Sequence, residues 1–435
     1  MPEVSKKITG EIVISSEALT EIEKEIKNLS DFREKIEVFL EKGVTEILEI
    51  ILGGAISLDA SDIHIEPREK EAKLRVRVDG ILQDVLFLDK GVQENILSRI
   101  KLLSGIKLNI TDRSQDGRFS IVSKKNLIEI RTSTLPAEYG ESLVLRVLNP
   151  KSLIDMGALG LRENLLKIFG REIKKPNGMI IVTGPTGSGK TTTLYAFLKK
   201  IQKPEIKTIT IEDPIEYHLE GISQTQVNPQ KGYDFVNGLR AIVRQDPDVI
   251  LVGEIRDLET AQISLQAALT GHLVLTTLHT NDAAGTVARL QALGETAVNI
   301  APAINMAVAQ RLVRKVCQKC VKLGKAPHQF LEKLKKELKG MPTEVKVPKI
   351  GEGLKIPQAM GCRDCNFTGY RGRVGIFEAF LVDDEMEKFI LKSPSIAALK
   401  EEAIKKGMVT MKQDGLIKIL EGITTIEEVE RVVGE

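Results

Sequence analysis

The sequence predicts an α/β fold whose larger part is a mainly parallel sheet covered by helices. Three observations lead to this prediction. The length of 435 residues suggests two or three domains. From about residue 179 onward, short apolar strands alternate regularly with helical patterns, which is typical of a parallel sheet. A glycine-rich phosphate-binding motif connects the first strand and the first helix of that series.

The composition excludes several function classes. Lys and Arg number 62 against 60 Asp and Glu, and this balance argues against a chain that coats nucleic acid. Trp is absent and aromatic residues make up only 4%, so few side chains could stack on bases. The N-terminus lacks the apolar stretch of a signal peptide, and the longest apolar run, near residues 44–58, is too short to span a bilayer. We therefore expect a cytoplasmic protein whose membrane contact, if any, is peripheral.

The first 150 residues predict a small α+β domain. Residues 1–40 form an N-terminal extension, expected to hold a short strand and a helix, and residues 41–150 form the domain itself. Apolar residues with helical spacing start at Val44, whereas residues 73–78 alternate between polar and apolar and end in Asp79-Gly80, as in a strand that enters a hairpin. Further elements are expected as a helix at 93–103 and strands at 119–122, 127–132 and 142–147.

Residues 151–435 predict the second domain. A helical pattern at 163–169 precedes its alternating elements. The expected strands are 179–183, 208–211, 249–252 and 273–278, and the expected helices are 190–202, 233–244 and 261–269. An insert at about 312–378 and a helical tail at about 384–435 complete this domain.

The glycine-rich motif fits G-x-x-x-x-G-K-[ST] and lies between an apolar strand and an amphipathic helix. Glycines let backbone N–H groups wrap a phosphate, and the helix N-terminus adds a favourable dipole. The lysine can reach the β- and γ-phosphates and the following threonine can ligate Mg²⁺. A chance glycine turn is the alternative. The predicted nucleotide-binding residues are Gly184, Pro185, Thr186, Gly187, Ser188, Gly189, Lys190, Thr191 and Thr192.

Acidic residues follow two of the predicted strands. The strand at 249–252 ends in Gly253-Glu254, where the usual magnesium-binding aspartate is replaced by glycine, so Glu254 would serve the metal, polarise water, or both. Glu212, Asp213 and Glu216 follow the strand at 208–211. In parallel sheets, nucleotides bind at the carboxyl ends of the strands, which is where these acids are expected. The alternative for each acid is a helix cap or a solvated loop.

Two histidines flank the strand at 273–278. His279 at its C-terminal end could sense the γ-phosphate through a hydrogen bond, or could be structural. His272 at its start is more readily a structural hydrogen bonder. The pattern assigns no role to His64 or His328.

Together, these motifs resemble the secretion ATPase superfamily, specifically the type II secretion and type IV pilus assembly ATPases of the GspE/PulE and PilB type. The P-loop, the Asp box at 210–216, the atypical Walker B strand at 246–254 and the His box at 270–281 carry the resemblance, together with the segments 60–67 and 75–80. The similarity covers roughly residues 44–435.

The resemblance implies a PAS-like N-terminal domain and a RecA-like motor domain that assemble as a homo-hexamer. It makes Arg75 and Arg77, which alternate on one strand, candidate arginine fingers toward the γ-phosphate. Arg240 and Arg244, four residues apart on a helix, could serve a neighbouring subunit's site or pair with acids. A solvated basic strand or helix is the alternative for each pair. Many relatives carry a further N-terminal docking domain, whereas only about 40 residues precede the core here.

Four cysteines form two C-x-x-C pairs, Cys317 with Cys320 and Cys362 with Cys365. Two such knuckles supply four thiolates for a structural zinc ion and leave no cysteine over. A redox role is the alternative. Within the resembled family this element marks assembly ATPases. The segment between the knuckles is basic, with 12 Lys and Arg against 3 Glu from Arg311 to Lys349. It could face anionic lipid or an acidic partner domain, or could simply be a solvated helix.

These patterns predict an ATPase that uses ATP and Mg²⁺, with Lys190, Glu212, Glu216, Glu254 and His279 in the reaction and Thr191, Asp213 and Glu254 near the metal. The resemblance implies a hexameric motor at the inner face of the cytoplasmic membrane, powering pilin or pseudopilin assembly or protein secretion through a platform protein and its cytoplasmic adaptors. A pilus retraction or DNA-uptake ATPase is the alternative, and a RecA-like nucleic-acid motor is a weaker one. Direct nucleic-acid contact is not expected.

Overall fold

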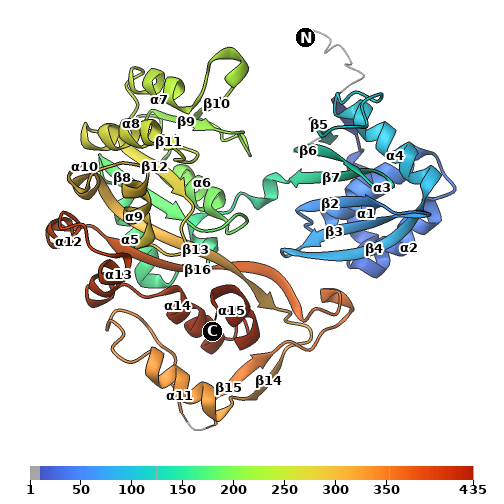
Figure 1. Cartoon of the computed structure of the whole chain (residues 1–435). Coiled ribbons are helices and arrows are strands. Elements are labelled where there is room, and N and C mark those ends of the chain that lie inside the picture. The colour runs from blue at the N-terminus through green and yellow to red at the C-terminus, as the bar shows by residue number, and fades with distance from the viewer. Residues whose placement is uncertain (1–9, 124–125, 352, 435) are drawn as a thin grey trace. The chain divides into compact units, whose positions relative to one another are not determined.

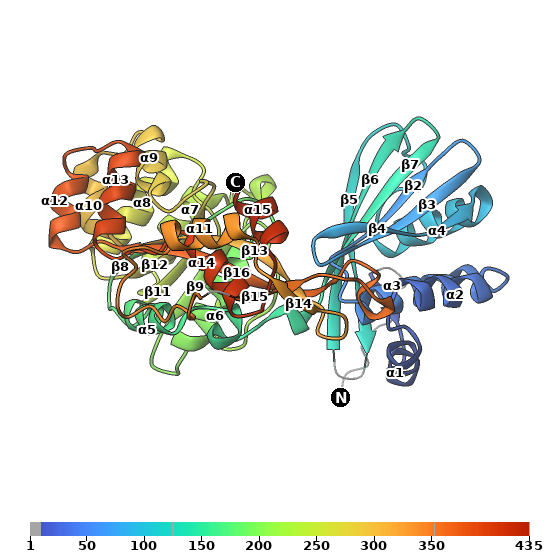
Figure 2. The same cartoon turned by 90° about the horizontal axis from the view of Figure 1, so that it is seen from below.

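The computed structural model describes residues 10–123, 126–351 and 353–434. The chain folds into two compact units (Figures 1 and 2). The first comprises residues 1–152 with Cys317–Val321 and Ala359–Arg371, and the second comprises Leu153–Val316, Lys322–Gln358 and Gly372–Glu435. The cysteine-bearing segments thus belong to the same compact unit as the N-terminal residues.

The first unit contains a seven-stranded sheet in the order β1-β5-β6-β7-β2-β3-β4. Its strands are antiparallel except for β1, which lies parallel to β5. The bounds are β1 Glu11–Val13, β2 Asp62–Pro67, β3 Glu71–Val78, β4 Ile81–Asp89, β5 Gln115–Ser123, β6 Asn126–Ala137 and β7 Gly140–Leu148. The strand predicted from the alternation at 73–78 is β3, and Asp79-Gly80 form its hairpin turn, with Asp79 at a φ of 51° and Gly80 at 82°.

Four helices accompany this sheet: α1 Ser16–Glu25, α2 Leu29–Phe39, α3 Val44–Ser57 and α4 Lys90–Leu103 (Figure 2). Helix α4 packs on the sheet and α3 packs against α1, α2 and α4. The helices expected from Val44 and at 93–103 are confirmed as α3 and α4. The expectation of one helix before residue 40 was wrong, because Asn28 caps a second helix there by accepting a hydrogen bond from the Asp31 N–H.

The second cysteine segment contacts α2. The Arg363 guanidinium lies 2.9 Å from an Asp31 carboxylate oxygen, and the Asn366 Oδ1 accepts a hydrogen bond of 2.7 Å from the backbone N–H of Leu29. These contacts join residues more than 330 positions apart in the sequence.

The second unit contains a seven-stranded sheet in the order β10-β9-β11-β12-β8-β13-β16. The pairs among β8 to β13 are parallel, as predicted. The bounds are β8 Gly178–Thr183, β9 Thr208–Glu212, β10 Ser223–Gln226, β11 Val249–Val252, β12 Leu273–Leu278, β13 Ile304–Val316 and β16 Tyr370–Leu381. A short antiparallel pair, β14 Lys322–Lys325 and β15 Lys355–Gln358, lies outside it.

Helices cover both faces of this sheet (Figure 1). Side chains of β8 alternate between the two cores: Ile180 and Val182 pack with helices α5 and α6, whereas Met179 and Ile181 pack with α7 to α10. The bounds are α5 Glu163–Glu172, α6 Lys190–Ile201, α7 Phe235–Val243, α8 Leu258–Leu269, α9 Gly285–Ala292, α10 Ala297–Ala303 and α11 His328–Glu337. Burial on both faces explains why β8 and β11 are continuously apolar.

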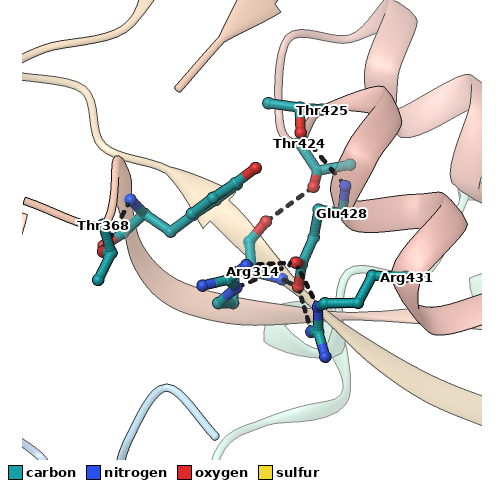
Figure 3. Close-up of polar contacts among 7 residues, drawn as sticks. Arg314, Thr368, Thr424, Thr425, Glu428 and Arg431 are labelled. Carbon is teal, nitrogen blue, oxygen red and sulfur yellow. Dashed lines mark hydrogen bonds and ion pairs between the residues drawn. The ribbon is translucent and has the colours of Figure 1, made fainter. Parts of the chain in front are cut away.

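The tail folds into α12 Asp384–Ile390, α13 Ile396–Lys405, α14 Met411–Leu420 and α15 Ile426–Val433. A buried carboxylate, Glu428, fixes α15 to β13 (Figure 3). It accepts a hydrogen bond from the Arg314 backbone N–H at 2.9 Å and from the Arg314 and Arg431 guanidinium groups at 2.7 Å each. Across the part of the chain that the structure describes, no helix combines the length and hydropathy needed to traverse a bilayer.

Candidate active site

The P-loop lies between β8 and α6, as the motif predicts. Gly184, Gly187 and Gly189 have φ values of 146°, 78° and 85°, in a region that side-chain-bearing residues rarely adopt. At Gly184 a Cβ atom would also lie 2.4 Å from the carbonyl oxygen of Gln310. The backbone can therefore take this path only with glycine at these positions, and the path ends at the N-terminus of α6, where free N–H groups favour phosphate.

Lys190 is folded back over this loop. Its ammonium group donates to the carbonyl oxygens of Gly184 at 2.8 Å and Pro185 at 3.2 Å. Burial lowers the pKa of Lys190, and the charges of Glu254 and Glu216 oppose that shift. The structure thus brings the predicted lysine and two of the predicted acids into one electrostatic neighbourhood.

Glu254 follows β11 and lies between an arginine and a histidine. One carboxylate oxygen lies 2.5 Å from the Arg256 guanidinium and the other lies 3.5 Å from the His279 Nε2. The preceding Gly253 donates its N–H to the Ile211 carbonyl at 2.8 Å, and a Cβ at Gly253 would lie 3.3 Å from that same oxygen. A side chain at this position would therefore require a small shift of the β9 backbone.

Glu212 ends β9 and is turned into the protein. It is only 3% exposed and accepts hydrogen bonds from Tyr195, from Thr210 at 2.6 Å and from Gln224 at 3.3 Å. Burial raises the pKa of Glu212, and those three hydrogen bonds oppose the rise. Its carboxylate is engaged by the protein itself.

The next two acids lie in the loop after β9. Asp213 is exposed, and its charge contributes to raising the pKa of Arg256, after the hydrogen bond and the charge of Glu254. Glu216 is half-buried, and its charge acts on both Lys190 and Glu212. The charge of Asp213 thus acts on the arginine partner of Glu254, and the charge of Glu216 acts on the P-loop lysine.

His279 follows β12, as predicted, and faces Glu254. Burial and the Lys190 charge lower the pKa of His279, whereas Glu254 raises it. The Thr183 hydroxyl links the C-terminal ends of β8 and β12, because it accepts a hydrogen bond of 2.8 Å from the Thr280 N–H. His272 instead contacts the Ala267 carbonyl through Nδ1 at 3.0 Å, which matches the structural role weighed for it.

The predicted arginines lie in different places. Arg240 on α7 forms an ion pair with Glu259, while Arg244 at the end of that helix is exposed. Arg75 and Arg77 lie on the outer face of β3, opposite its apolar residues, as the alternation predicts. The structure places Arg75 between Glu66 at 3.3 Å and Asp84 at 3.0 Å, and Arg77 beside Asp62 at 3.2 Å.

The same outer face carries a second arginine pair that the sequence patterns did not single out. Arg131 on β6 lies directly opposite Arg146 on β7. Like charges directly opposite on a sheet are unfavourable unless anions accompany them, and here Glu129 lies 3.5 Å from Arg131 and Asp62 lies 3.2 Å from Arg146. Only the strand register reveals this pair, because the two arginines lie in separate sequence segments.

The four cysteines cluster, with all of their sulfur atoms within 4.8 Å of one another. The Sγ–Sγ distances are 3.9 Å for Cys317–Cys362, 3.8 Å for Cys320–Cys365 and 3.7 Å for Cys362–Cys365. Zinc–thiolate bonds of about 2.3 Å in a tetrahedron place sulfurs roughly 3.8 Å apart, so the residues fit this ion. Burial raises the pKa of the Cys320 thiol to about 12, whereas for Cys365 backbone N–H groups of Cys362 and Gly369 outweigh burial and lower it.

A family model described as "Type II/IV secretion system protein" matches residues 39–431. The chain belongs to this family. The type IV pilus assembly ATPase PilB of Thermus thermophilus is 44% identical over 390 residues, which is 89% of this chain and 43% of that protein. The type II secretion system ATPase E of Vibrio cholerae is 44% identical over 395 residues, 90% of this chain and 76% of that protein. The chain thus spans less than half the length of the Thermus relative.

Solved structures agree with the assigned fold. The Legionella pneumophila ATPase DotB superposes with a TM-score of 0.64 at 22% identity over 89% of this chain and 95% of that one. The pilus retraction motor PilT with bound ADP gives a TM-score of 0.59 at 26% identity over 88% and 95%. The predicted mixed α/β class is confirmed. The chain's place among the secretion ATPases follows from its family. The PAS-like character of the N-terminal domain stays a prediction.

Proposed function

We propose that the chain is an ATP-hydrolysing motor that acts as a homo-hexamer and drives the assembly of pilin or pseudopilin subunits, or protein secretion. The observation that carries the proposal is the meeting of Lys190, Glu254 and His279 at one edge of the parallel sheet, beside a P-loop with the required glycine conformations. Parallel sheets bind nucleotides at this edge.

Each group of site residues would have its own role in hydrolysis. Backbone N–H groups of residues 184–192 would bind the phosphates, and Lys190 would leave its loop carbonyls to neutralise the β- and γ-phosphates. Thr191, with Asp213 or Glu254 nearby, would hold Mg²⁺. When bound, this ion would supply charge neutralisation at the γ-phosphate.

Among the three candidate bases, Glu254 and Glu216 are favoured over Glu212. The Glu212 carboxylate is buried and accepts hydrogen bonds from three internal donors, so it would orient Tyr195 and Gln224 rather than contact a water molecule. Glu254 lies at a strand end beside Arg256 and His279, at the edge of the sheet where a nucleotide would bind, and from there it can orient water toward the γ-phosphate.

Arginines from β3 and from helix α7 would complete the site. Arg75 and Arg77 are proposed fingers toward the γ-phosphate, and they would have to exchange carboxylate partners for phosphate when they do so. Arg244 is exposed and available to a neighbouring subunit, whereas Arg240 would first leave Glu259.

The four cysteines are proposed to hold one structural zinc ion, because four thiolates leave no open ligand position. The ion would supply cross-linking of the two knuckles. The tetracysteine element favours an assembly or secretion motor, as the names of the curated relatives do. PilT among the solved relatives keeps retraction or DNA uptake as the second candidate.

The proposed partners are an inner-membrane platform protein and its cytoplasmic adaptors, with this chain on the cytoplasmic side and peripheral to the membrane. The basic segment between the cysteine pairs supports contact with an acidic surface, since Lys325 and Lys355 lie directly opposite each other in the β14–β15 pair. Direct nucleic-acid contact is not proposed.

Phosphate release by the full chain tests this function. We expect MgATP hydrolysis that is independent of added DNA, together with a mass near six subunits when nucleotide is present. Stimulation of hydrolysis by DNA would instead indicate a nucleic-acid motor, and binding of ATP with no turnover would indicate a scaffold. Restoration of pilus extension or of secretion in a deletion strain would then separate assembly from retraction.

A further inference from the structure

Gln310 lies at a special position beside the P-loop. Strand β13 is the parallel neighbour of β8, with Ala309 opposite Thr183. The next residue along each strand is therefore Gln310 on one side and Gly184, the first P-loop glycine, on the other. Gln310 is a polar residue with only 2% of its surface exposed, so its polar groups must be used by the protein or by a ligand.

Gln310 touches both ends of the loop. Its backbone carbonyl oxygen would lie 2.4 Å from a Cβ at Gly184, and its side-chain Nε2 would lie 2.9 Å from a Cβ at Gly189. One residue thus limits the space at the start of the loop with its main chain and at the end of the loop with its side chain.

A single hydrogen bond fixes the orientation of the amide group. The Thr193 hydroxyl, one turn into α6, donates to the Gln310 Oε1 at 2.6 Å. With the oxygen held toward Thr193, the NH₂ group is directed toward Gly189, where the phosphate-binding N–H groups of α6 begin. Ser188, beside it in the loop, has a buried hydroxyl without a hydrogen-bond partner in the described part of the chain, so the cradle is not closed by the protein alone.

We propose that Gln310 is a positioning residue for nucleotide binding, held by Thr193 and holding the P-loop in the shape that receives the phosphates. Its NH₂ group also adds positive potential next to the phosphate cradle. The inference rests on the proposed use of this loop for ATP. It extends that proposal to the neighbouring strand β13, which carries no nucleotide motif of its own.

Isothermal titration of the full chain with MgADP tests the proposal. Loss of one such hydrogen bond is expected to weaken MgADP binding about fivefold in Gln310→Ala and in Thr193→Val. Thr193→Ser keeps the hydroxyl and should bind as the wild-type protein does. Gln310→Glu should weaken binding more than Gln310→Ala, because it keeps an acceptor for Thr193 but places a negative charge beside the phosphates.

Ser264→Ala is the matched control. Its hydroxyl is equally buried in the same unit and donates within α8 to the Thr260 carbonyl at 2.7 Å, so its loss lowers the unfolding midpoint without touching the loop. Unchanged MgADP affinity in Gln310→Ala, or equal affinities for Thr193→Val and Thr193→Ser, would overturn the inference while leaving the proposed function intact. A wild-type protein that fails to bind MgADP would overturn both.

Discussion

Two polar clusters of the larger unit differ in how fully the protein satisfies them. Around Glu428, both carboxylate oxygens accept hydrogen bonds from two arginines and a backbone N–H. At the P-loop, Lys190 donates to carbonyl oxygens of the loop itself, and the buried Ser188 hydroxyl has no partner among the described residues. A complete network fixes one structure, whereas an incomplete one at glycine-rich backbone accommodates a ligand.

Lys190→Ala breaks the P-loop side of this comparison and has the largest expected effect. Because the ammonium group neutralises the transferring phosphate, MgATP turnover should fall by roughly 10²-fold or more, while the unfolding midpoint changes little. Phosphate release and thermal unfolding measure the two quantities. Lys200→Ala, on the exposed side of α6, is the control and should leave both as in the wild-type protein.

Removal of the cysteine ligands tests a third cluster, which needs an ion to become complete. Cys362→Ser should abolish one bound zinc per chain and destabilise the smaller unit by roughly 3 kcal/mol or more, because the knuckle also holds α2 through Arg363 and Asn366. Elemental analysis and calorimetric unfolding measure these effects. Lys319→Ala, in the other knuckle, changes a side chain that is 65% exposed and paired with Asp364, and should keep the zinc.

Glu428→Gln breaks the complete network. It removes the charge that compensates the largely buried Arg314, so the larger unit should lose about 2–4 kcal/mol in denaturant unfolding. The matched control is Glu430→Gln on the same helix. Its ion pair with Lys333 is partly exposed to solvent, so its loss should cost about 1 kcal/mol or less. Equal losses in the two variants would mean that the Glu428 network stabilises the unit no more than a partly exposed ion pair does.

The pH dependence of that loss is the smallest expected effect. Burial alone would raise the pKa of Glu428, but hydrogen bonds from Arg431 and Arg314 outweigh it and hold the pKa below its ordinary value of 4.5. The stabilisation is therefore complete above pH 4.5 and is lost as the pH falls through the lowered value. The stability gap between wild-type and Glu428→Gln should shrink only below pH 4.5, and a gap that grows there would contradict the assignment.

Local patterns predicted the parts of the site that adjoin in sequence. The P-loop, the acid after β11 and the histidine after β12 lie where strand-end reasoning places them, since parallel strands end at one edge. The cysteine cluster also followed from spacing alone. These features depend on short sequence segments, so they can be predicted without knowledge of distant contacts.

Features that depend on distant partners were not predictable. The inward turn of Glu212 depends on Tyr195 and Gln224, which lie in other elements. Strands β13 and β16 were missed because their burial does not alternate regularly, and β13 begins directly after a helix. The association of the cysteine segment with α2 joins residues too far apart for any pattern to indicate.

The central claim is that the strand-end acid Glu254 acts on nucleotide held by the P-loop. Parallel measurement of MgATP affinity and turnover in Glu254→Gln tests it most directly. We expect turnover to fall by roughly 10²–10⁴-fold with an affinity within a few-fold of the wild-type protein, because the amide keeps the shape but cannot orient and activate water. Turnover near the wild-type rate in Glu254→Gln would contradict the claim.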